Sequence, residues 1–426
     1  MKSSLKNKSI DELYGILGQY PLILLESQLA GHPSSGSSYI AAKPKRSITA
    51  YGSTIEIFEN GDKKMFEMNP WDALQEFRKD KKSWLFGYFG YDLKNFVEDL
   101  ESKNLPLSNT PDMYFMEPEI LLKIEDSNVE LLGYDFDWKP TLKSELPGSV
   151  EMEFQPLIGK DEYLETVKTI QQKIHQGDFY EMNYTIPLCG GYLGNPYWLY
   201  SRMREINPVP FGAFISHEKF SVCCASPERF LKKDGNSIRS EPIKGTAARS
   251  LDSELDKINR DELMNEKNRA ENLMIVDLVR HDLSKVSKLG SVQVSKLYDV
   301  QTFGTVHQLI SVVESTAKEH IDPVEIIKNC FPMGSMTGAP KIEVMKTADQ
   351  LEMYKRGIYS GAIGYITPED DFDFNVVIRT AILQDDSLFY PVGGAITSDS
   401  DPESEWEECM IKSRNVTEIF ERELNL

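Results

Sequence analysis

One lysine, Lys244, stands in the segment EPIKGTAARS (Glu241–Ser250), between an isoleucine and a glycine and just after a proline. Proline and glycine favour turns, so this ammonium does not belong to an exposed helical face. A lysine amine attacks carbon only after losing its proton. Its ordinary pKa near ~10.4 opposes that loss unless burial or a nearby cation favours the neutral form. Lys244 is therefore a candidate nucleophile, and the alternative is a solvated loop lysine.

Glu271 is a carboxylate in an apolar helix. The helix is predicted over Arg269–Val286, and because it is apolar nearly all round between Leu273 and Val279 we expect it to be buried. Glu271 falls in its first turn, and a carboxylate on a buried stripe is costly unless it is paired, hydrogen-bonded or bound to a metal. The alternative is a carboxylate that the helix dipole stabilises by up to about 1 kcal/mol.

A second group of carboxylates lies on a helix predicted near the C-terminus. Asp401 as N-cap and Pro402 at the first helical position mark its start. Glu405, Glu408 and Lys412 follow at positions i, i+3 and i+7, which places them on one stripe. The alternative for Glu408 and Lys412 is an ordinary surface ion pair worth roughly 0.2–0.5 kcal/mol.

Glu271 and Glu408 are candidate ligands of one Mg²⁺ ion. That hard cation takes one or two carboxylates, with waters and an anionic group of the substrate in the remaining positions. Lys412, one turn beyond Glu408, would face the same anion. Glu405 would support the two ligands without touching the metal.

Other kinds of catalytic site find no support in the sequence. The six histidines form no i,i+4 or H-x-x-H pair, which disfavours zinc. The segment GSMTGAPK (Gly334–Lys341) lacks the G-x-x-x-x-G-K-[ST] spacing of a phosphate-binding loop, and no G-x-S-x-G motif is present. These observations disfavour a hydrolase or a nucleoside triphosphatase.

The composition is that of a soluble globular protein with an acidic excess. Among 426 residues, 67 acidic side chains face 47 basic ones, for a formal charge of −20. That charge disfavours nucleic acid and anionic membranes as partners, and no apolar run is long enough for a membrane span. The five cysteines show no C-x-x-C spacing, so we expect a reducing, cytoplasmic location.

The elements that must position these residues indicate an α+β fold. A helix is predicted over Lys160–Asp178, with Gly177 ending it. Strand-like runs such as Tyr20–Ser27 and Trp84–Leu93 bunch together, so we expect antiparallel sheets and not a doubly wound sheet. Residues 134–150 are a predicted linker between an N-terminal region, 1–150, and a catalytic region, 155–420. We expect the two regions to form one compact unit.

Seven motifs in this order resemble the chorismate-utilising enzymes. They are SPERF (Ser226–Phe230), EPIKGT (Glu241–Thr246), RAENLMIVDLVRHDL (Arg269–Leu283), GSMTGAPK (Gly334–Lys341), GAIGY (Gly361–Tyr365), IRT (Ile378–Thr380) and EWEECMIKSRN (Glu405–Asn415). The family comprises the first components of anthranilate and aminodeoxychorismate synthases together with isochorismate and salicylate synthases. The resemblance implies an anthranilate-synthase component I-like fold, in which two large, mainly antiparallel β-sheets pack together with helices outside.

The lysine in the P-I-x-G-T motif is similar to aminodeoxychorismate synthases, whereas anthranilate synthases carry alanine there. The resemblance implies Mg²⁺-dependent amination of chorismate at C4, on the route to 4-aminobenzoate and folate. Lys244 would attack C2 and expel the C4 hydroxyl, Glu228 would protonate that hydroxyl as a general acid with a raised pKa, and ammonia would then displace the lysine. The alternatives are an anthranilate synthase component I and, in another class, a non-catalytic scaffold for an amidotransferase.

The same resemblance implies a substrate pocket around these residues. Arg379 suits a substrate carboxylate because its planar guanidinium can bind it bidentately. For two of the other residues, Tyr359 and Ser335, the alternative is simple strand and loop packing. The predicted pocket consists of Arg379, Lys412, Tyr359, Ser335, Gly393, Gly394 and Thr246.

Two places depart from the family pattern. Glu181 stands where isochorismate and salicylate synthases keep a lysine that activates water and where ammonia users usually have glutamine, so we expect no water-adding reaction. Gln308 occupies the usual place of a histidine, and His307 precedes it. We do not expect His307 to be catalytic.

The resemblance also implies two further binding partners. A separate glutamine amidotransferase subunit would supply ammonia, because Cys189 in LCGG lacks the G-x-C-x-G form of a glutaminase nucleophile. The LLES segment (Leu24–Ser27) resembles a wall of the tryptophan pocket of relatives, so Leu25, Glu26 and Ser27 are expected to line such a pocket. The alternative is a core strand. We expect bound tryptophan not to inhibit strongly.

Overall fold

The computed structural model describes residues 8–29, 32, 34, 36–125, 128–133, 154–302 and 306–423. The predicted linker at 134–150 lies outside these ranges. The helices are α1 (Ile10–Leu17), α2 (Pro70–Lys79), α3 (Lys160–Gln176), α4 (Pro196–Ile206), α5 (Ser253–Glu262), α6 (Glu266–Val286), α7 (Pro323–Cys330), α8 (Lys341–Leu351) and α9 (Pro402–Glu423), with short 3₁₀ helices η2 (Tyr91–Phe96) and η3 (Gly334–Met336).

Strands dominate both the N-terminal and the catalytic region. In the N-terminal region they are β1 (Leu22–Glu26), β2 (Ser38–Tyr51), β3 (Thr54–Glu59), β4 (Asp62–Glu67), β5 (Leu85–Phe89), β6 (Met113–Glu125) and β7 (Asn128–Leu131). In the catalytic region they are β8 (Gln155–Pro156), β9 (Glu181–Gly191), β10 (Phe211–Ser216), β11 (Ser221–Ser226), β12 (Arg229–Asp234), β13 (Ser237–Glu241), β14 (Ile243–Ala248), β15 (Gln293–Thr302), β16 (Val306–Thr316), β17 (Gly338–Ala339), β18 (Ala362–Ile366), β19 (Phe372–Asn375), β20 (Thr380–Gln384) and β21 (Ser387–Ile396).

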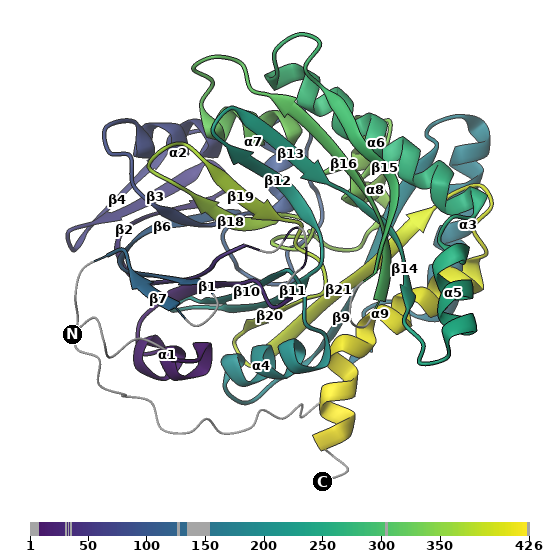
Figure 1. Ribbon diagram of the computed structural model, residues 1–426, viewed down its shortest axis with the longest axis horizontal. Coiled ribbons are helices and arrows are strands. Elements are labelled where there is room, and N and C mark those ends of the chain that lie inside the picture. The colour runs from purple at the N-terminus through teal and green to yellow at the C-terminus, as the bar shows by residue number, and fades with distance from the viewer. Residues whose placement is uncertain are drawn as a thin grey trace.

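The strands join in one mainly antiparallel network that packs against itself. The longest pairings are β2 with β6 and β9 with β21 (Figure 1). Apolar side chains from both halves meet in a shared core, with Phe86 and Tyr114 on one side and Ala213 and Val222 on the other. Burying apolar surface from two sheet faces in this way is the main stabilising contribution to such a layered fold.

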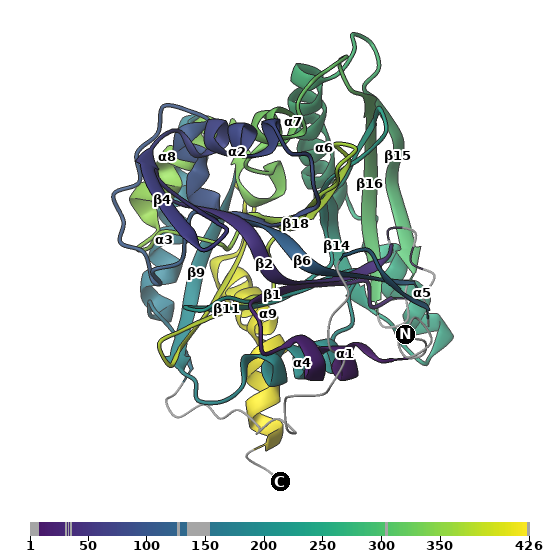
Figure 2. The same cartoon turned by 90° about the vertical axis from the view of Figure 1, so that its left-hand side faces the viewer.

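Helices cover the outer faces of the two halves. Helices α1, α3, α4 and α9 contribute to one outer core, and α2, α6 and α7 to the other (Figures 1 and 2). The predicted α+β class, with mainly antiparallel strands packed together and helices outside, is confirmed. No helix in the described part of the chain is long and apolar enough to cross a membrane.

The N-terminal and catalytic regions share the sheet. Strand β1 lies between β2 of its own region and β10 of the catalytic region, with Leu24 opposite both Ile40 and Phe214. Strand β5 likewise pairs with β18.

The helices that carry the candidate carboxylates differ in how well the sequence predicted them. Helix α9 starts at Pro402 as predicted, and the backbone N–H of Ser404 donates to the Asp401 carboxylate at 2.9 Å. Helix α6 begins at Glu266, earlier than predicted, because Asn265 caps it. Glu271 therefore lies in its second turn.

The expectation that α6 is buried all round is wrong. Ile275 is fully buried, but Leu273 is 44% exposed. The helix therefore lies on the sheet with one face in solvent.

Candidate active site

Lys244 is held inside the protein by two carboxylates. Its Nζ lies 3.1 Å from Glu181 Oε1 and 3.3 Å from Glu271 Oε2, and its side chain is only 13% exposed. The turn-forming neighbours allow this because the pairing of β14 with β16 shifts register between Ile243 and Thr246. The alternative of a solvated loop lysine is therefore wrong.

The surroundings of Lys244 favour its charged form. Burial alone would lower the pKa of Lys244, as we expected for a nucleophile, but the charges of Glu181 and Glu271 outweigh burial and hold that pKa above its ordinary value. With these protein groups alone, the Lys244 amine stays charged, which differs from the neutral amine that we expected. A proton must leave Lys244 before its nitrogen can bond to carbon.

Glu228 has the properties of a buried acid. It lies between β11 and β12 and is 5% exposed. Burial raises its pKa to about 7, although a hydrogen bond from Ser335 and the nearby charges of Lys244 and Arg379 act in the opposite direction. The raised pKa expected of a general acid is thus present, and the same interactions place Ser335, Lys244 and Arg379 around this carboxyl.

The carboxylates of α6 and α9 face one another. Lys267 on α6 lies 3.9 Å from Glu271 Oε1 and 3.7 Å from Glu405 Oε1. Glu408, one turn beyond Glu405, pairs with Lys412 at 2.6 Å. Burial would raise the pKa of Glu408, but Lys412 outweighs burial and holds that pKa below its usual range. The two helices therefore bring their predicted carboxylates to one side of Lys244.

Gly394 on β21 leaves room between the α9 side chains. A Cβ at this position would lie 3.2 Å from Glu405 Oε2, 3.7 Å from Glu408 Oε1 and 3.8 Å from Lys412 Nζ. The neighbouring carbonyl of Gly393 accepts a hydrogen bond of 2.6 Å from Lys412. A side chain at Gly394 would fill the space in which these charged groups meet.

The donor set suits a hard divalent cation. Glu271 Oε1 is buried and has no hydrogen-bond partner among the described residues. A charged carboxylate oxygen in this position is free to bind a cation. No cluster of three or more His, Cys, Asp or Glu side chains in the described part of the chain has the geometry of a protein metal cage. Two carboxylates with an unsatisfied oxygen instead fit Mg²⁺, which leaves its other positions to water and substrate.

The remaining predicted substrate residues lie at different depths. Among the described residues the Arg379 guanidinium forms no ion pair, and burial lowers its pKa in spite of Tyr390 and Glu228. Such a guanidinium is available to an incoming carboxylate. Tyr359 is 3% exposed, whereas Thr246 is exposed. The roles of these residues stay predictions.

Sequence reasoning did not assign a contact to Glu181. It noted this residue only as a departure from a family pattern, but the structure places its carboxylate against Lys244. The available signal was a charged residue at the start of the otherwise uncharged strand β9. His307 lies elsewhere, with its ring nitrogens 2.9 Å from Thr302 Oγ1 and 3.1 Å from Asp256 Oδ1.

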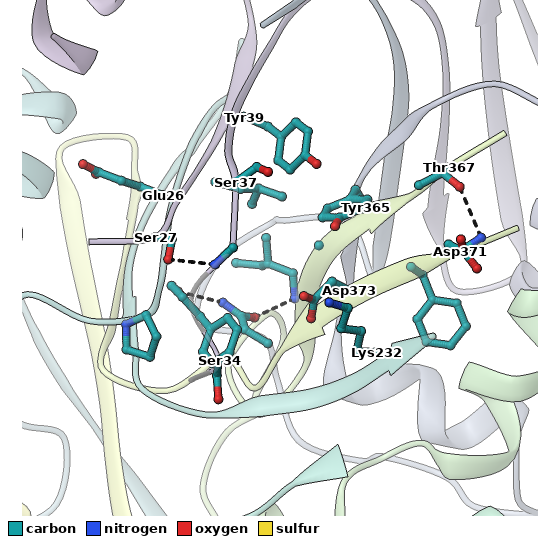
Figure 3. A pocket seen from close by; sticks show the side chains of 18 of the residues that line it. Glu26, Ser27, Ser34, Ser37, Tyr39, Lys232, Tyr365, Thr367, Asp371 and Asp373 are labelled. Carbon is teal, nitrogen blue, oxygen red and sulfur yellow. Dashed lines mark hydrogen bonds between the residues drawn. The ribbon is translucent and has the colours of Figure 1, made fainter. Parts of the chain in front are cut away.

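A separate cavity of about 320 Å³ opens between the N-terminal and catalytic regions (Figure 3). Leu25, Glu26 and Ser27 line it as predicted, and Tyr39 and Tyr365 contribute aromatic side chains. A network leads from this cavity toward the active site. In it, Arg229 binds Asp373 at the cavity wall, the Ser34 carbonyl and Glu241, which lies three residues before Lys244.

Comparison with known proteins identifies close likenesses over most of the chain. A probable chloroplastic aminodeoxychorismate synthase of Oryza sativa subsp. japonica is 35% identical over 87% of this chain, and the chain spans about half the length of that relative (48%). Aminodeoxychorismate synthase component 1 of Bacillus subtilis is 31% identical over 95% of this chain and 93% of its own length. Anthranilate synthase component 1 of Aquifex aeolicus is 30% identical over 94% of this chain and 89% of its own.

The fold has a counterpart among solved structures. The crystal structure of anthranilate synthase component I from Streptococcus pneumoniae superimposes with a TM-score of 0.79 at 26% identity, covering 92% of this chain and 94% of that one. The sequence family described as chorismate binding enzyme matches residues 20–418, which include every candidate residue discussed above. The chain belongs to the chorismate binding enzyme family.

Proposed function

We propose that this chain is an aminodeoxychorismate synthase component that aminates chorismate at C4 to give 4-amino-4-deoxychorismate. The observation that carries the proposal is Lys244, a largely buried lysine in contact with Glu181 and Glu271 and close enough to Glu228 to affect its pKa. Relatives named aminodeoxychorismate synthase component 1 that share about 30% of the sequence over almost their whole length support it.

The reaction proceeds in two displacements. Lys244, having passed its proton to a neighbouring carboxylate, bonds through Nζ to C2 of chorismate while the C4–O bond breaks. The C4 hydroxyl leaves as water with the proton of Glu228. Ammonia then bonds to C4, and the C2–Nζ bond breaks with its electron pair returning to Lys244. A buried carboxyl with a pKa of about 7 holds the required proton at neutral pH about half of the time.

Charge recognition orients the substrate. Arg379 and Lys412 bind the carboxylates of chorismate, and Ser335 fixes the carboxyl of Glu228. Glu271 and Glu408 would hold Mg²⁺. When bound, the ion would neutralise these two side chains and attract a substrate carboxylate.

The nitrogen source is a glutamine amidotransferase subunit. The term "component 1" in the names of relatives and the rice relative of about twice this length support a second functional part.

The five cysteines, all unpaired in the described structure, support a reducing compartment such as the cytoplasm.

Product analysis separates this proposal from its rival. The rival is anthranilate synthesis, which the Aquifex and Streptococcus proteins favour. Enzyme, chorismate, Mg²⁺ and ammonium chloride should yield 4-amino-4-deoxychorismate. Anthranilate with pyruvate as main products would refute the proposal. Failure to consume chorismate at any ammonium concentration would favour a non-catalytic scaffold.

Intact-protein mass spectrometry tests the role of Lys244. Incubation with chorismate and Mg²⁺, without ammonia, should give a covalent adduct on the native enzyme and none on Lys244→Ala. An adduct on the variant would place the nucleophile elsewhere.

A further inference from the structure

Glu181 has one carboxylate oxygen that the proposed reaction does not yet use. The side chain is about 3% exposed, and its Oε1 accepts a hydrogen bond from Lys244 at 3.1 Å. Its Oε2 is buried and has no hydrogen-bond partner among the described residues. A buried carboxylate oxygen without a donor costs free energy, so the site is poised for a ligand that donates hydrogen bonds.

The backbone around Glu181 fixes where this oxygen lies. Strand β17 pairs with the start of β9, and the Tyr180 N–H donates to the Ala339 carbonyl at 2.8 Å. Gly338 permits the close approach, since a Cβ there would lie 2.1 Å from the Glu181 carbonyl oxygen. The next residue, Met182, is fully buried in the core, so the alternation of the strand turns Glu181 to the Lys244 side.

The ligand expected at this position is small and cationic. In water near neutral pH the nitrogen donor is mostly ammonium, which carries four N–H donors and one positive charge. It must reach C4 of the substrate ring beside Lys244 and must lose a proton there before its nitrogen has a free electron pair. We propose that Glu181 binds the nitrogen donor as ammonium through Oε2 and accepts its proton. This inference rests on the proposed function.

In the second displacement, Glu181 takes up one proton from ammonium and later gives that proton to Lys244. The ammonium N–H bond breaks toward Oε2, and the freed nitrogen bonds to C4. The C2–Nζ bond breaks with its electron pair on Lys244. The new amine gives up a further proton to solvent. The Glu181 carboxyl turns so that its protonated oxygen faces Lys244 and returns that proton to the departing Lys244 nitrogen. No oxidant, reductant or other reagent is needed.

The charges that face Glu181 favour a cation at this stage. They are Lys244 on β14 and Lys267 and Glu271 on α6, while β17 contributes only glycine and alanine. Once Lys244 is bonded to substrate through an uncharged nitrogen and the protons it gave up have reached solvent, Glu181 no longer has a cationic hydrogen-bond partner. Burial raises the pKa of Glu181 in spite of Lys244, which makes its carboxylate a better proton acceptor.

The test compares the native enzyme with Glu181→Gln. Glutamine keeps an oxygen that can face Lys244 but replaces Oε2 by an NH₂ group, which neither attracts ammonium nor takes a proton. We would measure the KM for total ammonium at saturating chorismate and Mg²⁺ and fixed ionic strength, from about pH 7 to about pH 9. The KM of the native enzyme for total ammonium should change by less than about threefold over this range. The KM of Glu181→Gln should fall about tenfold per pH unit, because only free ammonia would act as its substrate.

Controls keep the outcomes apart. Glu117→Gln changes another buried glutamate, paired with Arg46 in the N-terminal region, and should keep the native ammonium profile. A native KM that itself falls about tenfold per pH unit would overturn the inference, whether or not the variant folds. Identical profiles for the native enzyme and Glu181→Gln would also overturn it. Anthranilate as product would refute the proposed function but leave this ammonium comparison readable, because that reaction consumes ammonia as well.

Discussion

Replacing Glu228 by glutamine should abolish most of the activity and yet stabilise the protein. Glutamine cannot protonate the departing hydroxyl, so turnover should fall by about 10²–10⁴-fold. The native pKa of about 7, against an ordinary value of 4.5, means that ionising this buried carboxyl costs about 3 kcal/mol. Glutamine has the same shape and never bears that cost.

The sign of the stability change follows from linkage. Because the folded pKa lies above the unfolded one, the folded state holds the proton more tightly. The native free energy of unfolding therefore decreases as pH rises from about 4.5 to about 7 and is level above that range. The variant lacks this decrease. Relative to the native enzyme, its stability should grow across that window and reach about 3 kcal/mol at alkaline pH.

Two measurements decide this prediction. Urea unfolding of both proteins at about pH 5 and about pH 8.5 gives the difference in stability, and the pH profile of native kcat/KM should decline above about pH 7 as Glu228 loses its proton. A variant that is less stable than the native enzyme at the higher pH would refute the reasoning. So would a native profile that stays flat through pH 7.

Two further substitutions and one ligand should change the activity or the stability of the enzyme. Ser335→Ala removes a hydrogen bond that lowers the pKa of Glu228, so the alkaline decline of kcat/KM should move to higher pH; a shift to lower pH would contradict this assignment. Glu408→Gln should raise the Mg²⁺ concentration needed for half-maximal activity by at least about tenfold, equivalent to ~1.4 kcal/mol of lost binding, with activity recovered at high Mg²⁺. An unchanged Mg²⁺ titration would remove Glu408 from the metal site. Tryptophan present at about 100 times its dissociation constant should stabilise the protein by about 2.7 kcal/mol in thermal unfolding while changing turnover less than about twofold. Strong inhibition would instead favour anthranilate synthesis.

Local signals in the sequence predicted much of the fold because they are short in range. Gly177 ends α3 in a left-handed conformation with φ of +87°, and Asp401 caps α9. The start of α6 was misplaced because Asn265, a good cap, precedes the apolar pattern by several residues. Amphipathic pattern fixes the middle of a helix better than its ends.

The charge state of the candidate nucleophile was beyond the reach of sequence. Lys244 and Glu181 are 63 residues apart, and no periodicity reveals that the first residue of β9 faces β14. The pKa of a buried lysine depends on the balance between burial and such long-range partners. The order of the motifs could therefore suggest which chemical groups take part. Only the three-dimensional arrangement shows that the carboxylate of Glu181 pairs with the amine of Lys244.

The position of β1 between β2 and β10 limits how this chain can be shortened. A fragment beginning at residue 155 would leave the edge of β10 unpaired and would remove the Leu25–Ser27 wall of the large cavity. An uncovered strand edge invites association with other chains. A chain whose large cavity bound nothing would therefore still need its first third, because β1 pairs with the edge of β10 in the catalytic region.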